Sequence, residues 1–582
     1  MILVALLIAG AAAGQEEFDL LSRSLRPEGR AELEANAAPL AHLPVSEVEA
    51  ELDPKTARVE GQLRLVVRNR EASAWSEIVL RAYPQGRSGT SLRVDDVRVD
   101  GKRAAARARG TVVIVPADVA PGATAAITLS FRGQLLRLRE GEDDPLVAVS
   151  QFAPGMGALS GRPRATDRGE GTFAVGPHGA VLVDWYPQLA ARAQGRWDRE
   201  ELGSVGDVGH ADPGAAVVAL TVPKGWRVGG AGSALGQHAV SAAKEMATFA
   251  AAGIRGALGI AASPGFDELS EDASGVQLRA SSLHGEAGAR DLLSCARAAL
   301  QSLQARFGPY PWTSLALAEV ALTGGAEGVE LPGIALLAQA TLPRPPAGNL
   351  LAGMFEFTCY HEVAHQWWQG VVGSDPRRTP WVDEALAQYS AVLVEHDTKG
   401  QAAAEQTLGT FVSLNYHGMR MARVPDEKVA RPSKEFRSAV AFAGLVYGKA
   451  PLFYHRARVL MGDELFNAAG RAYRQAWAFR EAGASAWLDA ARQADPTHAA
   501  ELAALERRWF HEKHGDEDIA PPDALALMDA LGRGGNGLTQ LLRAAQQDGG
   551  PYDAQTREAL KQLERVLPEL SRMIQESAPD EP

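Results

Sequence analysis

The stretch HEVAHQWWQG, residues 361–370, constrains the fold of this chain more than any other feature of its sequence. On a helix, positions four apart lie on one face, so His361 and His365 can direct both imidazoles at one point. Glu362 then lies beside that point, as a carboxylate next to two zinc ligands would. The alternative is coincidence, because a chain of this length with 13 histidines contains such a pattern by chance in about 2% of cases.

A third acidic residue stands where a third zinc ligand is needed. Zinc in hydrolytic sites typically has three protein ligands and keeps one position open. The helical pattern breaks at GSDPRRTP and restarts as WVDEALAQYSAVLVEH, whose first turn carries Glu384, with 18 residues between His365 and Glu384. An antiparallel second helix would return this carboxylate to the imidazoles. The sequence therefore predicts one zinc ion per chain, held by His361, His365 and Glu384.

Length and composition indicate a globular protein with several domains. At 582 residues the chain is several times the usual size of one domain, so we expect three or more. Hydrophobic residues make up 46% and charged residues 22% of the sequence. No apolar run reaches the roughly 20 residues that span a bilayer, so no stable membrane insertion is expected. The net charge of −12, with both signs interleaved, argues against nucleic acid or an anionic membrane as the main partner.

Residues 40–245 alternate apolar and polar positions, as half-buried strands do. Asp100 and Gly101 are typical of a hairpin turn, and the Gly-, Pro- and charge-rich residues 140–171 read as a long loop. We expect a β-sandwich-like region here. Its inward positions are Leu63, Leu65, Val67, Ile127, Leu129, Phe131, Val218, Leu220 and Val222.

The period changes to that of helices from about residue 285. A first helix is expected to end at Gly308 and Pro309, followed by the strand-like SLALAEVAL and a Gly-rich turn in TGGAEGVELPGIALL. A further helix, which begins near Asn349, carries the two histidines, and most of the remainder is helical. The buried face of the first helix is predicted to contain Leu292, Ala296, Ala299, Leu303 and Phe307.

The N-terminus and the cysteines bear on the cellular compartment. Residues 1–14 combine a short apolar run with a small-residue end, as a secretory signal peptide does, although no Lys or Arg precedes the run. This predicts export to the periplasm or the medium; if the segment is not a signal, the protein is cytoplasmic. Cys295 and Cys359 are the only cysteines, and both lie in helical apolar patterns that favour buried thiols over a disulfide.

The motifs together resemble the gluzincin aminopeptidase family, the group that contains aminopeptidase N and leukotriene hydrolase. HEVAHQWW resembles the family's HExxHxWF, and WVDEALAQY resembles its WLNEGFAxY. GVELPGI at 328–334 resembles the exopeptidase stretch GAMEN, and LVYGKAPLF at 445–453 resembles YxKGA. The resemblance implies an N-terminal β-rich domain at 40–245, a thermolysin-like catalytic domain at 246–460 and a C-terminal helical region and tail at 461–582.

The resemblance also implies roles for individual residues. Glu362 would be the general base, and Tyr447 would stabilise the oxyanion. Gly328 and Glu330 would bind substrate, with Glu330 at the free amine of a peptide. Departures from the family bear on specificity: Val329 and Leu331 replace Met and Asn of GAMEN, Asp383 replaces an Asn, and Ala450-Pro451 replaces Gly-Ala. The nearby Glu327 is a second candidate for the amine anchor.

The implied activity is zinc-dependent removal of N-terminal residues from peptides with a free N-terminus. Two alternatives stay open. One is a zinc endopeptidase, or a zinc hydrolase of another substrate, without specificity for a free amine. The other is a catalytically silent binding protein that retains a zinc helix. The presence of Glu362 and Tyr447 argues against it, because holding a metal requires neither.

Overall fold

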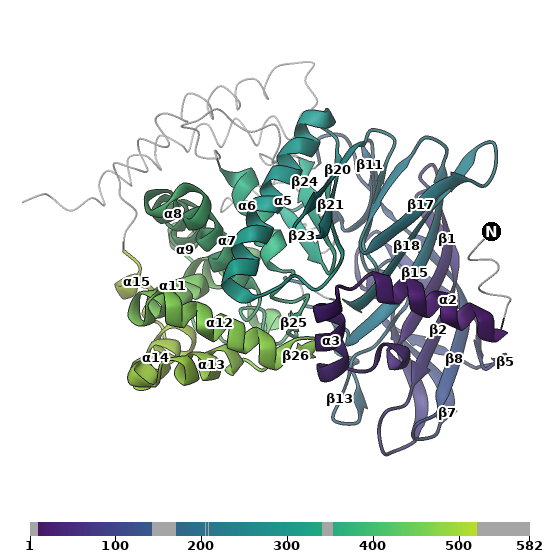
Figure 1. Cartoon of the computed structure of the whole chain (residues 1–582), viewed down its shortest axis with the longest axis horizontal. Helices are drawn as coiled ribbons and strands as arrows, with labels where there is room; N and C mark the ends of the chain where they lie inside the picture. The colour runs from purple at the N-terminus through teal and green to yellow at the C-terminus, as the bar shows by residue number, and fades with distance from the viewer. Residues whose placement is uncertain (1–9, 143–169, 204, 208, 340–352, 521–582) are drawn as a thin grey trace, which may run out of the picture.

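The structure is a computed structural model that describes residues 10–142, 170–203, 205–207, 209–339 and 353–520. A β-rich part forms one end of the molecule, a smaller sheet with helices lies in the middle, and the C-terminal helices form the other end (Figure 1). The predicted mixed α and β class, with strands first and helices last, is confirmed. Within the described residues, no helix is both long and apolar enough to cross a membrane.

The largest sheet has eight strands in the order β17-β18-β15-β1-β2-β8-β4-β5. Neighbouring strands are antiparallel except β1 and β15, which are parallel. The strands are β1 (Val45–Asp53), β2 (Arg58–Arg68), β4 (Ser91–Val99), β5 (Lys102–Arg103), β8 (Thr124–Gln134), β15 (Pro213–Pro223), β17 (Ser233–Ala239) and β18 (Lys244–Arg255).

Two smaller sheets share one hydrophobic core with the large sheet, which gives the predicted sandwich-like arrangement. One has the order β12-β3-β7-β6 and the other β16-β19-β11-β10-β9. Their strands are β3 (Trp75–Arg81), β6 (Arg107–Arg109), β7 (Val112–Val119), β9 (Leu136–Arg137), β10 (Phe173–Gly176), β11 (Gly179–Leu182), β12 (Gln188–Leu189), β16 (Arg227–Gly230) and β19 (Ile260–Ser263).

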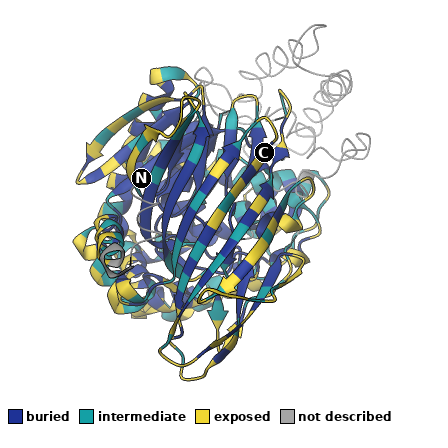
Figure 2. Cartoon of the chain, turned by 90° about the vertical axis from the view of Figure 1, so that its right-hand side faces the viewer, coloured by how far each residue is buried: buried dark blue, intermediate teal, exposed yellow. Residues whose placement is uncertain are grey.

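The predicted alternation holds along most of these strands. All nine predicted inward positions are buried, and Figure 2 shows buried and exposed residues alternating along strands of the large sheet. The turn between β4 and β5 has positive φ at Asp100 (48°) and Gly101 (77°), as a two-residue hairpin turn requires.

Strand β15 departs from a one-sided pattern. Val217 and Ala219, on the face opposite to Val218, are buried as well. The helices α2 (Gly10–Arg23) and α3 (Pro27–Asn36) contribute Leu21 and Leu33 to a second core on that face. The strand is therefore covered on both faces, a feature that alternation within the strand alone does not reveal.

A five-stranded sheet in the order β20-β21-β22-β24-β23 lies beneath the helices of the middle part. The edge strand β23 is antiparallel to β24, whereas β21, β22 and β24 are parallel. Helix α5 (Gly285–Phe307) buries its predicted face and ends before Gly308, as expected. The strands are β20 (Asp267–Ala273), β21 (Val276–Ser282), β22 (Ser314–Val320), β23 (Gly328–Leu331) and β24 (Ile334–Ala338).

Helix α6 (Met354–Ala364) packs against α7 (Glu384–Lys399) and against β23 and β24. The predicted helix start near Asn349 lies outside the described residues. The later elements are β25 (Val372–Gly373), α8 (Gln401–Thr407), η5 (Leu408–Ser413), α9 (Leu414–Met421), α10 (Ala439–Phe442), η7 (Ala443–Lys449), α11 (Ala450–Met461), α12 (Asp463–Trp477), β26 (Arg480–Glu481), α13 (Ala486–Ala494), α14 (Ala499–Glu506), η9 (Arg507–His511) and α15 (Gly515–Asp518).

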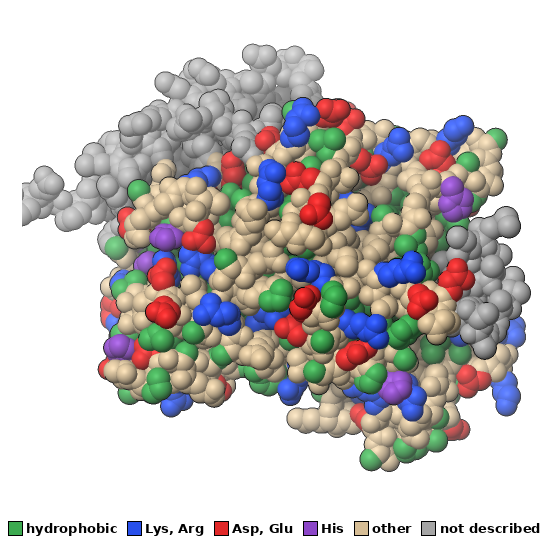
Figure 3. Space-filling model, viewed as in Figure 1, with side chains coloured by type: hydrophobic (Ala, Val, Ile, Leu, Met, Phe, Trp, Pro, Cys, Tyr) green, Lys and Arg blue, Asp and Glu red, His purple; other side chains and the backbone are tan. Residues whose placement is uncertain are grey.

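Other sequence expectations have mixed outcomes. Most of the predicted 140–171 loop, and the chain from 521 onward, lie outside the described residues. The large sheet continues through β18 to Arg255, past the predicted boundary between 245 and 246, and the division into domains stays a prediction. Cys295 and Cys359 are buried free thiols, as expected. On the described surface in Figure 3, side chains of both charge signs are interspersed.

Candidate active site

The predicted metal ligands converge at the contact between α6 and α7. His361 Nε2 and His365 Nε2 are 3.0 Å apart. Glu384 Oε2 lies 3.4 Å from the first nitrogen and 3.3 Å from the second. All three side chains are buried, and together they form a group that could hold a metal ion.

The distances within this group suit zinc. Bonds of about 2.0–2.1 Å to a tetrahedral zinc ion place neighbouring nitrogen and oxygen ligands roughly 3.3 Å apart. Among the described residues, Glu384 Oε2 has no hydrogen-bond partner although it is buried, and such an atom needs a cation or another partner. His365 Nδ1 lies 2.9 Å from the carbonyl oxygen of Trp368, which leaves Nε2 as the nitrogen free to bind a metal.

Glu384 is placed by the start of its helix. Asp383 is the N-cap of α7, and its Oδ1 accepts a hydrogen bond from Glu384 N at 2.9 Å. Ser374 Oγ donates to Asp383 Oδ2 at 2.7 Å. Burial acts to raise the pKa of Glu384, but the contacts with His361 and His365 outweigh it and hold the pKa well below its usual range.

Glu362 lies against the edge strand β23 at Gly328. A Cβ atom at Gly328 would be 2.2 Å from Glu362 Oε1, so a larger residue at this position would require the carboxylate to move. Glu362 Oε2 is buried and has no hydrogen-bond partner among the described residues. Burial, with the charge of Glu330, raises the pKa of Glu362 well above its usual range; a cation held by the ligand group would favour the carboxylate again.

Glu330 is on the same face of β23 as Gly328, because side chains two positions apart point the same way. It is half-buried, and burial and the charge of Glu384 raise its pKa, against the opposing effect of His365, to about 7. Gln366, two residues after the end of α6, links this strand to the helix: its Oε1 accepts from Gly333 N at 2.8 Å and its Nε2 donates to the carbonyl of Leu331 at 3.0 Å.

The alternative anchor, Glu327, directly precedes β23 and contacts another part of α6. Its Oε2 accepts a hydrogen bond from Thr358 Oγ1 at 3.1 Å. Thr358 is one helical turn before Glu362, so Glu327 is engaged at a level of α6 that precedes the metal ligands. The geometry therefore favours Glu330 over Glu327 as the carboxylate that faces the ligand group.

Tyr447 reaches the site from the C-terminal helices. Its hydroxyl donates to Glu384 Oε1 at 2.7 Å, and it lies in the π-helical segment η7, a local geometry frequent at functional sites. Gly448 lets this helix approach α9 closely, because a Cβ there would be 2.6 Å from Tyr416 N. Burial and the charge of Glu384 raise the pKa of Tyr447 well above its usual range, which keeps the hydroxyl protonated as a donor.

The sequence did not single out the half-buried carboxylate of Asp207. Burial and the charges of Glu330 and Glu384 raise its pKa well above the usual range. The neighbouring Gly206 lies against the ring of Phe442, which packs at 5.9 Å from the ring of Tyr447. No motif marks Asp207, because it comes from the β-rich part of the chain.

The two tryptophans after His365 belong to the core. Trp367 and Trp368 are almost fully buried. Trp367 Nε1 donates to the carbonyl of Gly308 at 3.0 Å, and Trp368 Nε1 donates to Ser390 Oγ at 2.9 Å. The second bond joins the turn after α6 to α7, so these residues support the site without facing it.

Comparison with known proteins shows which fold surrounds this site. No family model and no curated protein matches the sequence. Solved structures do resemble the chain. A glutamate-to-alanine mutant of the M1 zinc metallopeptidase of Deinococcus radiodurans has a TM-score of 0.55 at 18% identity, over 82% of this chain and 95% of that chain.

Two further structures agree. The same mutant bound to a Tyr-Ser-Ala substrate has a TM-score of 0.56, and a two-domain M1 zinc metallopeptidase mutant bound to L-tryptophan has 0.57, both at 18% identity over 82% of this chain and 95% of the other. The chain therefore has the fold of the M1 zinc metallopeptidases. The resemblance to this group that the sequence motifs indicate is confirmed at the level of the fold.

Proposed function

We propose that this chain is a zinc-dependent aminopeptidase that removes N-terminal residues from peptides. The observation that carries the proposal is the convergence of His361, His365 and Glu384 beside the buried carboxylate of Glu362. The similar Deinococcus radiodurans protein was solved with a Tyr-Ser-Ala substrate, which supports a peptide substrate here. The apolar N-terminus supports an exported enzyme.

The proposed roles follow from position. Zinc, held by His361, His365 and Glu384, would act as a Lewis acid toward water and the substrate carbonyl. Glu362 takes a proton from the attacking water and delivers it to the leaving amine. Tyr447, which donates to Glu384 in this structure, donates to the oxyanion as it forms. Glu330 accepts hydrogen bonds from the α-ammonium group and so sets which peptide bond is cleaved.

The function is tested with pairs of peptides that differ only in N-terminal acetylation. The full chain, loaded with zinc, is expected to cleave free peptides one residue at a time and to cleave acetylated ones poorly. Equal cleavage of both would contradict aminopeptidase specificity and favour the endopeptidase alternative. No cleavage of either by a zinc-loaded chain would favour the silent binding protein.

Glu330→Ala is expected to lower kcat/KM for free peptides by about a hundredfold, because a charge-assisted contact that positions the substrate is lost. Zinc content and the melting temperature should stay unchanged. Steady-state kinetics on free and acetylated peptides measure the effect. Glu327→Ala is the matched comparison, and a loss confined to that variant would move the anchor three residues along the chain.

Tyr447→Phe is expected to lower kcat by about a hundredfold with little change in KM, because the lost hydroxyl acts on charge that develops in the transition state. The ring that packs against Phe442 and His361 is retained. A rise in KM alone would contradict this role. Single-turnover measurements separate a slow chemical step from slow product release.

A further inference from the structure

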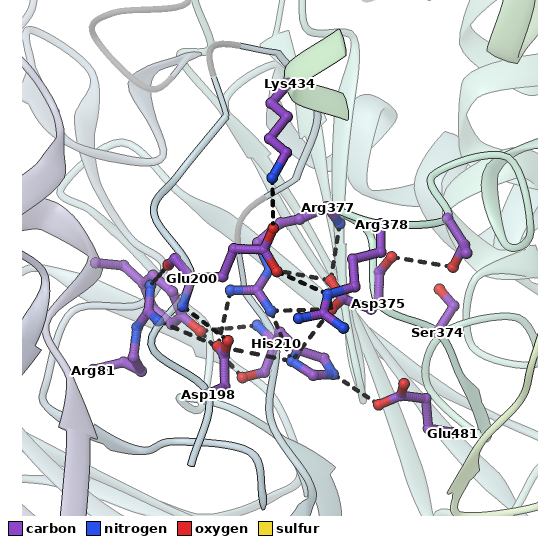
Figure 4. Close-up of polar contacts among 12 residues, drawn as sticks. Arg81, Asp198, Glu200, His210, Ser374, Asp375, Arg377, Arg378, Lys434 and Glu481 are labelled. Atoms are coloured by element: carbon purple, nitrogen blue, oxygen red, sulfur yellow. Dashed lines mark hydrogen bonds and ion pairs between the residues drawn. The ribbon is translucent and has the colours of Figure 1, made fainter. Parts of the chain in front are cut away.

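A charged cluster outside the ligand group holds the chain segment that leads into α7 (Figure 4). We call residues 373–383 the ligand connection, because they lie between the two metal-ligand helices and end at the N-cap of α7. The side chains that surround it come from the β-rich part, from the connection itself and from the C-terminal part. This connection cluster consists of Arg81, Asp198, Glu200, His210, Asp375, Arg377, Arg378, Lys434 and Glu481.

Arg377 is the centre of the cluster. Its Nε and Nη2 donate to the two oxygens of Asp375 at 3.0 and 3.1 Å. Its Nη1 donates to Asp198 Oδ2 at 2.8 Å, and the same oxygen accepts from Arg81 Nη1 at 3.2 Å. The four side chains are at most 9% exposed. One carboxylate of the β-rich part is therefore shared by two guanidinium groups, and one of these belongs to the ligand connection.

The outer side chains of the connection cluster contact other parts of the molecule. His210 Nε2 lies 2.8 Å from Glu481 Oε2 on β26, and its Nδ1 lies 3.0 Å from Arg377 Nη2. Glu200 accepts from Arg378 at 2.8 Å and from Lys434 at 3.2 Å. These contacts join segments far apart in the sequence around one short stretch.

The beginning of the ligand connection is also covered by Arg255, at the end of β18. A Cβ atom at Gly373 would lie 2.4 Å from Arg255 Cζ, so the guanidinium occupies the space that a side chain would fill. Arg255 also donates to the carbonyls of Ala211 at 3.2 Å and Arg480 at 3.0 Å. Gly373 thus packs against an arginine of the β-rich part. Asp375 is bound by Arg377, which in turn donates to Asp198 of the same part.

A short path of hydrogen bonds leads from the ligand connection to the metal ligand Glu384. Ser374, between Gly373 and Asp375, donates to Asp383, which in turn accepts from the backbone of Glu384. This contact places the backbone at the start of α7, from which the Glu384 side chain extends. Loss of the outer contacts that place a metal ligand typically weakens metal binding. Removing one partner of a buried ion pair leaves an uncompensated buried charge, which is strongly destabilising.

We propose that Asp198, Asp375 and Arg377 are positioning residues for the zinc ligand Glu384, so that zinc affinity depends on contacts between the β-rich part and the ligand connection. This inference rests on the proposed zinc site. It assigns a role in the site to a carboxylate, Asp198, that is remote from the ligands in sequence and lies outside the ligand group.

The test is Asp198→Asn in the full chain, because this change keeps the shape of the side chain and removes the charge that Arg81 and Arg377 share. Zinc affinity, measured by competition with a chromophoric chelator, is expected to fall by about tenfold. The visible spectrum of the cobalt(II)-substituted variant is expected to differ from that of the wild type, because it reports the geometry of the ligands.

Glu32→Gln is the matched control. It breaks another ion pair of a buried arginine, Glu32 with Arg474 at 2.6 Å, between α3 and α12, and it leaves the ligand connection untouched. This variant is expected to keep wild-type zinc affinity and cobalt spectrum even where its melting temperature falls. Equal effects of the two variants, or none from Asp198→Asn, would overturn the inference.

Ser374→Ala decides the matter if Asp198→Asn does not fold. It removes only the hydroxyl that donates to Asp383, and zinc affinity is expected to fall severalfold. An unchanged affinity would overturn the inference. These measurements need no substrate. A wild-type chain that binds zinc but cleaves no peptide would therefore overturn the proposed function and leave the positioning role standing.

Discussion

Glu362→Gln is expected to keep zinc in the site and to lower kcat by about a thousandfold, within the range that a general base contributes. The amide has nearly the shape of the carboxylate, so it fits against Gly328, where a Cβ would already be 2.2 Å from the glutamate oxygen. It cannot accept the proton of the attacking water. The three ligand side chains are unchanged, so metal content should equal that of the wild type.

The measurement combines metal analysis with steady-state kinetics on free peptides. Glu395→Gln is a suitable control, because Glu395 is also a buried carboxylate, on α7, but pairs with Lys399 at 3.1 Å. It should keep most of the activity. A Glu362→Gln variant with wild-type kcat would show that another group is the base, and one without zinc would show that Glu362 supports the metal site itself.

The sequence was most informative where the contacts are local. His361 and His365 are four positions apart, and helix geometry alone brings their imidazoles together. Glu384 required one further assumption, an antiparallel return after a short break, and α7 does begin at Glu384. The strand pattern of the β-rich part could be predicted for the same reason, because the alternation of apolar and polar residues is local too.

The sequence favours Glu330 over Glu327 only through the family spacing that Gly333 and the following strand keep, and the assignment stays a proposal. It depends on which face of β23 is turned toward α6, and that is set by the contact of Gly328 with Glu362 and by the bonds of Gln366 to the turn after β23. Each of these contacts joins two segments whose relative register has no local signal.

The connection cluster could not be predicted from the sequence for a related reason. Asp198 pairs with Arg81 and Arg377, yet the chain has 59 basic and 71 acidic residues, and composition does not say which of them meet. The sequence treated GSDPRRTP only as a break between helices. Its Asp375 and Arg377 are in fact buried, because charges from the β-rich part close over them.

Removal of zinc is expected to abolish peptide cleavage. His361, His365 and Glu384 present three ligand atoms within 3.4 Å of one another, and without a cation the site offers only buried side chains that cannot polarise a carbonyl to a comparable extent. Dialysis of the full chain against a chelator should bring the rate to background, and one equivalent of zinc should restore it.

His365→Ala makes the same prediction without a chelator. With one of the three ligands gone, the chain should hold well under one zinc per molecule and show no measurable turnover. His455→Ala is the control: this partly buried histidine lies on α11, with Nδ1 at 3.4 Å from the hydroxyl of Tyr389 and outside the ligand group, so zinc content and rate should stay near those of the wild type. Because the melting temperature of both variants can be followed in parallel, loss of metal is separable from loss of fold. Full zinc content in a folded His365→Ala chain would mean that the metal binds elsewhere, and the ligand assignment on which the proposed function depends would be wrong.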